Sequence, residues 1–103
     1  MKHAWIGGRF HKVKRPLIPV INPATEEIID HVPQGTAEDA NLAVHAARDA
    51  FKTWRWLPGV EKAGMLHEIA RCLRANKKDF ARLMTLEGGK PFCENRDEVE
   101  WTA

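Results

Sequence analysis

The sequence predicts an α+β protein, with β-strands in its first third and helices in the remainder. β-Branched segments separated by turn residues fill positions 1–35, and an amphipathic helical period begins after Thr36. Glycine and proline then divide the helical part into segments. We therefore expect a single incomplete domain over residues 1–103, with strands and turns in 1–35 and three to four amphipathic helices in 36–103. Because the strands come first, the chain lacks the strand–helix alternation of a complete Rossmann sheet.

The first strand pattern surrounds a glycine pair. Trp5-Ile6 leads into the turn signal Gly7-Gly8, and Arg9-Phe10 resumes the extended pattern.

A second pair of strands is predicted at 17–21 and 28–32. Between them, Asn22-Pro23 favours a turn, since proline fixes φ and asparagine starts turns readily. We expect a hairpin joined at Asn22 to Glu26. Three prolines in this region lack a backbone donor, which places these strands at a sheet edge or outside a main sheet: Pro16, Pro19 and Pro33.

The first helix is predicted to begin at Thr36, because Asp39 three residues later completes a pattern similar to a capping box. Pro58-Gly59 ends it. Its apolar residues recur at helical spacing and share one face: Ala40, Ala43, Val44, Ala47, Ala50, Phe51 and Trp54.

Three further helical segments follow. The second runs from about Val60 to Ala75, with Leu66, Ile69, Ala70 and Leu73 on its apolar stripe, and it ends or bends at Asn76. The third carries Phe80, Leu83, Met84 and Leu86, and Gly88-Gly89 terminates it. Asn95, followed by Glu98, is predicted to be the N-cap of a fourth helix through Val99 and Trp101. A helix opening so close to Ala103 suggests a truncated chain.

Composition argues for a soluble globular class, with 44% hydrophobic and 29% charged residues. A net charge of +2 is too small to indicate nucleic acid or an anionic membrane as a partner. No apolar run approaches the roughly 18 residues of a membrane span, and the N-terminus does not resemble a signal peptide. We therefore expect a cytoplasmic protein with no nucleic-acid and no membrane partner.

Cys72 and Cys93 are too few for a disulfide framework. A bridge between them is conceivable, but free thiols in a reducing compartment are the simpler interpretation. Cys93 precedes a predicted helix start, where a thiol pKa can fall, yet no base is assignable to it. We expect a buried or half-buried inert thiol at Cys93 and a packing residue at Cys72.

Two motifs suggest ligand chemistry but are incomplete. Gly88-Gly89-Lys90 lacks the first glycine and the final Ser or Thr of a phosphate loop, so a helix C-cap followed by a proline stop is favoured. His67-Glu68 begins a zinc-protease signature, but Arg71 stands where the second histidine is required. The five histidines show no metal-ligand spacing.

Charged residues gather in two places. A basic run could meet phosphates but also describes a solvated helix face: Arg71, Arg74, Lys77, Lys78 and Arg82. An acidic cluster is predicted at the start of the fourth helix, where it would complement the helix dipole: Glu94, Asp97, Glu98 and Glu100.

Five segments together resemble the entry region of the NAD(P)-dependent aldehyde dehydrogenases. In order, these are Trp5-Ile6-Gly7-Gly8, Val20 to Thr25, Ala50-Phe51 with Trp54, Leu66 with Ile69-Ala70, and Glu87 with Gly89-Lys90-Pro91. Lys62 stands where the family usually has arginine, which keeps the charge but loses bidentate geometry.

The resemblance implies a partial piece of the family's cofactor-binding domain and, in the full-length enzyme, oxidation of an aldehyde to a carboxylic acid with NAD or NADP. The family's nucleophilic cysteine, general-base glutamate, oxyanion-stabilising asparagine and Gly-rich cofactor turn lie beyond this length. We therefore assign no catalytic, cofactor-binding or metal residue and expect the chain alone to be inactive. Its expected partner is the remainder of the dehydrogenase chain or a complementing subunit.

The alternative is a short stand-alone remnant that acts as a helical interaction module or a split-enzyme subunit. Exposed apolar helix faces motivate it, since such patches commonly mark partner surfaces, and self-association through them is expected.

Overall fold

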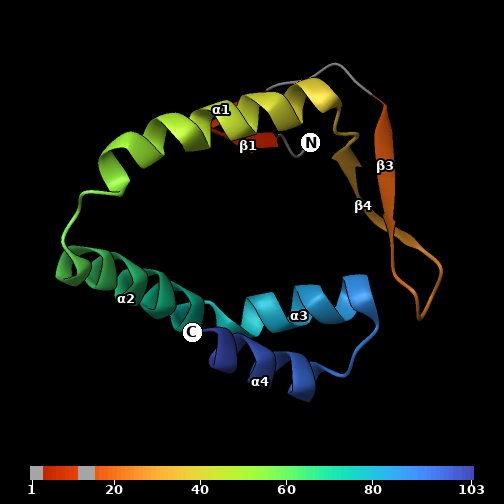
Figure 1. Cartoon of the computed structure of the whole chain (residues 1–103). Coiled ribbons are helices and arrows are strands. Elements are labelled where there is room, and N and C mark those ends of the chain that lie inside the picture. The colour runs from red at the N-terminus through yellow and green to blue at the C-terminus, as the bar shows by residue number, and fades with distance from the viewer. Residues whose placement is uncertain (1–3, 12–15) are drawn as a thin grey trace. The chain divides into compact units, whose positions relative to one another are not determined.

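A computed structural model describes residues 4–11 and 16–103. Within these residues lie two two-stranded sheets and four helices, which confirms the predicted α+β class without a complete Rossmann sheet (Figure 1). The chain divides into two compact units, residues 1–20 with 30–57 and residues 21–29 with 58–103. The single domain expected from the sequence over residues 1–103 stays a prediction.

The first unit contains the hairpin of β1 (Ala4–Ile6) and β2 (Arg9–His11), which pair antiparallel. Gly7 and Gly8 both have positive φ, at 60° and 77°, as a tight hairpin turn requires. Trp5 and Phe10 are cross-strand partners whose ring centroids lie 4.6 Å apart in an edge-to-face arrangement. The predicted turn and extended segments are therefore confirmed.

The predicted second hairpin is also confirmed, as β3 (Leu17–Ile21) paired with β4 (Ile28–Pro33). Asn22 organises its turn: the side-chain Oδ1 accepts from the Ala24 amide at 3.0 Å, and its backbone oxygen accepts from the Glu26 amide at 2.8 Å. Glu26 has a positive φ of 60°, which lets the chain reverse before β4.

The first unit also holds α1 (Ala37–Trp54), which begins with the predicted capping box. The Thr36 Oγ1 accepts from the Asp39 amide at 3.3 Å, and the Asp39 carboxylate accepts from the Thr36 amide at 2.9 Å. β1 lies against this helix, yet no residue of α1 is buried.

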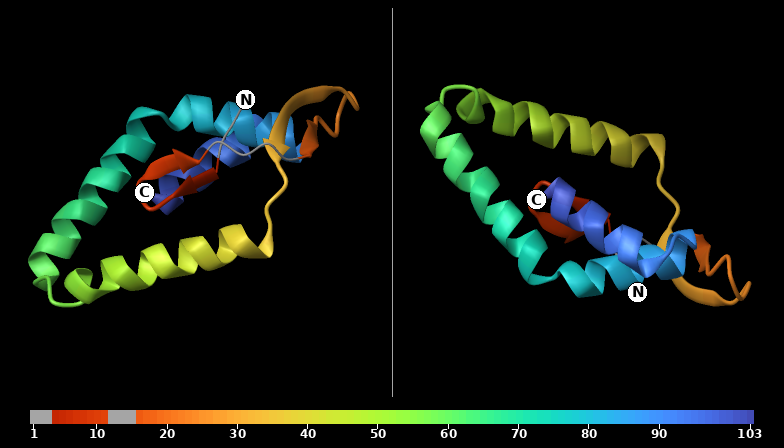
Figure 2. Two further views of the ribbon diagram at one scale, coloured as in Figure 1. Left: turned by 90° about the horizontal axis from the view of Figure 1, so that it is seen from above. Right: turned by 90° about the horizontal axis from the view of Figure 1, so that it is seen from below.

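The second unit contains α2 (Gly59–Ala75), α3 (Lys77–Gly88) and α4 (Phe92–Thr102). Asn76 alone separates α2 from α3, so the predicted break there is confirmed. After Gly88 the chain reverses, and α4 packs along α3, as the two views of Figure 2 show. The buried residues of the described chain all lie in this pair: Ala81, Asn95 and Val99.

No helix within residues 4–11 and 16–103 combines the length and the apolar character needed to cross a membrane.

Candidate functional site

The turn between α3 and α4 combines a left-handed glycine with a close tertiary contact. The Gly89 amide donates to the Thr85 carbonyl at 2.9 Å, with Gly89 at φ 73°. A Cβ on Gly89 would lie 2.8 Å from Cγ of Pro23, so the Asn-Pro turn of the second hairpin meets the Gly-Lys-Pro turn directly. Gly89 therefore satisfies both a left-handed backbone and a close contact, which no other residue does without strain.

This geometry decides how Gly88-Gly89-Lys90 is used. Gly89 caps the C-terminus of α3, and the Lys90 ammonium pairs with the carboxylates of Glu98 and Glu94 in α4. The hydrogen bond to Glu98 is the main cause of a raised Lys90 pKa. The predicted C-cap is confirmed, and the lysine forms ion pairs with α4.

Asn95 corrects a sequence prediction, because it is not the N-cap of the fourth helix. The helix begins three residues earlier, at Phe92, after Pro91, which has φ −54° and an extended ψ of 141°. Asn95 is buried at 2% exposure, and its Nδ2 donates to the Thr85 Oγ1 at 2.9 Å and to the Lys90 carbonyl at 3.1 Å. The side chain thus ties α4 to α3 and to the turn.

The prediction that the acidic cluster lies at the start of this helix is also wrong, because the helix begins earlier than expected. With the helix starting at Phe92, only Glu94 lies in the first turn. Asp97 forms an ion pair with Arg96, and Glu98 forms one with Lys90. The cluster therefore supplies ion pairs along α4 more than it complements the helix dipole.

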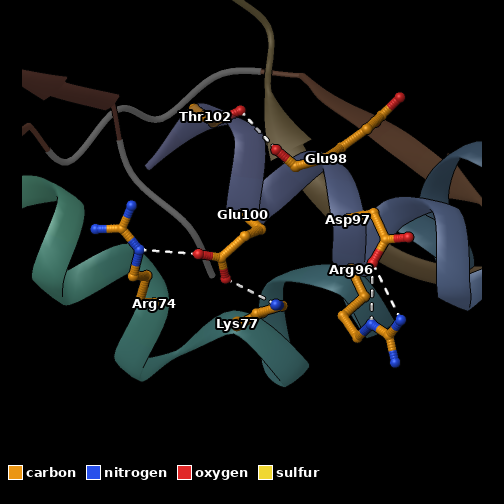
Figure 3. Close-up of polar contacts among 7 residues, drawn as sticks. All are labelled: Arg74, Lys77, Arg96, Asp97, Glu98, Glu100 and Thr102. Carbon is orange, nitrogen blue, oxygen red and sulfur yellow. Dashed lines mark hydrogen bonds and ion pairs between the residues drawn. The ribbon is translucent and has the colours of Figure 1, made fainter.

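Glu100 joins α4 to the α2–α3 junction. Arg74 Nε and Lys77 Nζ donate to its two oxygens at 3.0 and 2.8 Å, as Figure 3 shows. The bond from Lys77, followed by that from Arg74, lowers the pKa of Glu100. These pairs are partly exposed, so each adds little to stability in water.

The pairing extends to a third residue of the basic run. Arg71 donates to Glu68 within α2 at 2.6 Å, and this bond raises the Arg71 pKa. Arg71, Arg74 and Lys77 thus all have carboxylate partners in the second unit. The absence of a nucleic-acid partner stays a prediction.

Both cysteines are free, as predicted, but they are exposed. The prediction of a buried or half-buried thiol at Cys93 is therefore wrong. Cys72 lines an open cavity of about 280 Å³ beside Ile69, Leu73 and Phe80. It lies on the apolar side of α2 as expected, but it is exposed there. Among the residues that the structure describes, no group of three or more His, Cys, Asp or Glu side chains could hold a metal ion.

The second unit exposes much apolar surface. A cavity of about 380 Å³ lies between α2, α3 and α4, lined mainly by Leu73, Phe80, Met84, Val99 and Trp101. Trp101 is 82% exposed. In the α2 stripe predicted from periodicity, Leu66 and Ile69 are exposed, whereas Ala70 and Leu73 are half-buried.

The first unit repeats this pattern along α1. Val44, Phe51 and Trp54, which share its predicted apolar face, are all exposed. An open cavity of about 450 Å³ lies at the C-terminal end of the helix, lined by Ala47, Ala50, Phe51, Thr53, Trp54 and Leu57. Large apolar patches of this kind mark surfaces that pack against something else.

Two contacts at this site were not predicted: the bond from Asn95 to Thr85, and the approach of Pro23 to Gly89. One signal was available for the first, since Phe92, Asn95, Val99 and Thr102 recur at helical spacing and place Asn95 on the face of Val99. No local pattern relates Pro23 to Gly89, which lie far apart in the sequence.

The arrangement of two hairpins followed by four helices is found within much larger dehydrogenases. The sequence profile of the Aldehyde dehydrogenase family matches residues 10–103, and the chain belongs to this family.

Individual relatives agree. Aminoaldehyde dehydrogenase 1, peroxisomal, from Malus domestica is 44% identical over 94 residues, covering 86% of this chain and 18% of the relative. The crystal structure of lactaldehyde dehydrogenase from Escherichia coli matches with a TM-score of 0.94 and 36% identity, over 97% of this chain and 21% of that one.

Betaine aldehyde dehydrogenase from Staphylococcus aureus, in a structure of a point mutant with NAD⁺, matches with a TM-score of 0.88 and 29% identity, over 96% of this chain and 21% of that one. The chain thus spans about a fifth of the length of the relatives it matches. The family identification made from the five sequence segments is confirmed.

Proposed function

We propose that this chain is the N-terminal segment of an NAD(P)-dependent aldehyde dehydrogenase and has a structural role there, as an outer layer of the cofactor-binding domain. The observation that carries the proposal is the match over residues 10–103 to enzymes about five times as long. In this proposal, the whole enzyme oxidises an aldehyde to a carboxylic acid and acts in the cytoplasm.

The uncovered helix faces support a covering role. Burial of apolar surface contributes roughly 25 cal/mol per Å², so leaving these faces in water forfeits several kcal/mol. That loss is comparable with the whole stability of a small domain. Contact with the rest of a dehydrogenase would recover it.

In the same proposal, the chain is catalytically silent by itself. The cysteine nucleophile, the glutamate base and the nicotinamide site of such an enzyme come from the remainder of the protein. The purified chain, mixed with a simple aldehyde and NAD⁺ or NADP⁺, is expected to produce no reduced cofactor above a heat-treated control. Turnover that scales with the concentration of the chain would overturn this.

The structural role is tested by a chimera. We would replace the matching segment of the E. coli lactaldehyde dehydrogenase with residues 4–103 of this chain and assay it with lactaldehyde and a nicotinamide cofactor. We expect soluble enzyme with activity well above that of the same enzyme lacking the segment. A soluble but inactive chimera would contradict an exchangeable structural layer.

A matched pair of variants sharpens this test. The chimera carrying Gly89→Ala is expected to lose soluble yield, because the substitution strains the turn against Pro23. The chimera carrying Gly88→Ala should behave like the parent chimera, because a Cβ there meets no atom within 4 Å.

The second candidate function is a stand-alone helical interaction module or split-enzyme subunit, which self-associates through the apolar faces of α1 and α2. The exposure of Val44, Phe51, Leu66 and Ile69 favours it. Sedimentation of the purified chain distinguishes the two. A concentration-dependent dimer that binds less hydrophobic dye than the monomer would support the module, and a monomer without dye binding would argue against it.

A further inference from the structure

We draw no further inference here: the strongest candidate, the apolar cavity between α2, α3 and α4 lined by Leu73, Phe80, Met84 and Trp101, carries nothing because nothing in the structure shows what covers it.

Discussion

The helix α1 and the pair α3–α4 are both amphipathic, but they differ in the interactions that stabilise them. α1 has eighteen residues and a complete capping box, and none of its residues is buried. The pair α3–α4 has shorter helices without a side-chain cap, yet Ala81, Asn95 and Val99 are buried within it. Local signals therefore set the start of α1, whereas α3 and α4 bury residues against each other.

The difference implies two kinds of stability. An isolated helix is marginal in water, and most helical stability in proteins comes from packing of the apolar face. α1 should therefore open readily unless another surface covers Phe51 and Trp54. The pair α3–α4 should resist opening, because the hydrogen bonds and apolar contacts between the two helices and their turn form within a short stretch of chain.

The largest effect is expected at Gly89. Gly89→Ala should destabilise α3–α4 by about 2–4 kcal/mol, from the left-handed backbone and the overlap with Pro23 together. Amide hydrogen exchange in α3 and α4 measures this, with Gly88→Ala as the control. Equal exchange rates in the two variants would refute the proposed strain at residue 89.

The next effect is expected at Asn95. Asn95→Ala removes both hydrogen bonds and leaves the Thr85 hydroxyl and Lys90 carbonyl without this partner. We expect a loss of about 1–3 kcal/mol, measured from exchange of the α4 amides. Asn41→Ala, at an exposed site in α1, serves as the control and should leave α4 unchanged. Protection of α4 that survives Asn95→Ala would show that apolar packing alone holds the pair.

The corresponding test in α1 is a cap deletion. Thr36→Ala should reduce the stability of α1 by about 1 kcal/mol, because the Asp39 amide loses its acceptor. Far-ultraviolet circular dichroism and exchange of the first-turn amides report the change, which should not reach α3 or α4. Thr53→Ala, near the other end of the helix, is the control. An equal effect of both substitutions would mean that the cap does not fix the start of α1.

The smallest effect is a pH dependence at Glu100. Its pKa is lowered in the folded chain, chiefly by Lys77 and then by Arg74. Its contribution to stability is therefore present above the unfolded value of about 4.5 and is lost as the pH falls below that value. Glu100→Gln should flatten this part of the stability profile between about pH 5 and pH 3, measured by urea unfolding. Glu87→Gln is the control, and an unchanged slope in Glu100→Gln would contradict the assignment.

Much of the local structure could be predicted, because its causes are local. The turns at Gly7-Gly8 and Asn22-Pro23, the cap at Thr36 and the C-cap at Gly89 each depend on the conformational preferences of a few adjacent residues. The failure at Asn95 is instructive. A capping residue three positions before a glutamate satisfies the sequence rule, but the helix already begins at Phe92, directly after Pro91. The side chain that suited a cap was then free to form tertiary hydrogen bonds.

The sequence by itself determined the family, the order of strands and helices, and most element boundaries, because these follow from periodicity, turn chemistry and short motifs. Only the tertiary structure decided that Pro23 meets Gly89, that Asn95 is buried against Thr85, and that Glu100 joins Arg74 and Lys77. It also decided that Cys72, Phe51, Leu66 and Ile69 are exposed. The physical reason is that the burial of a residue depends on which segments, distant in the sequence, come together in space. No short pattern along the chain specifies those contacts.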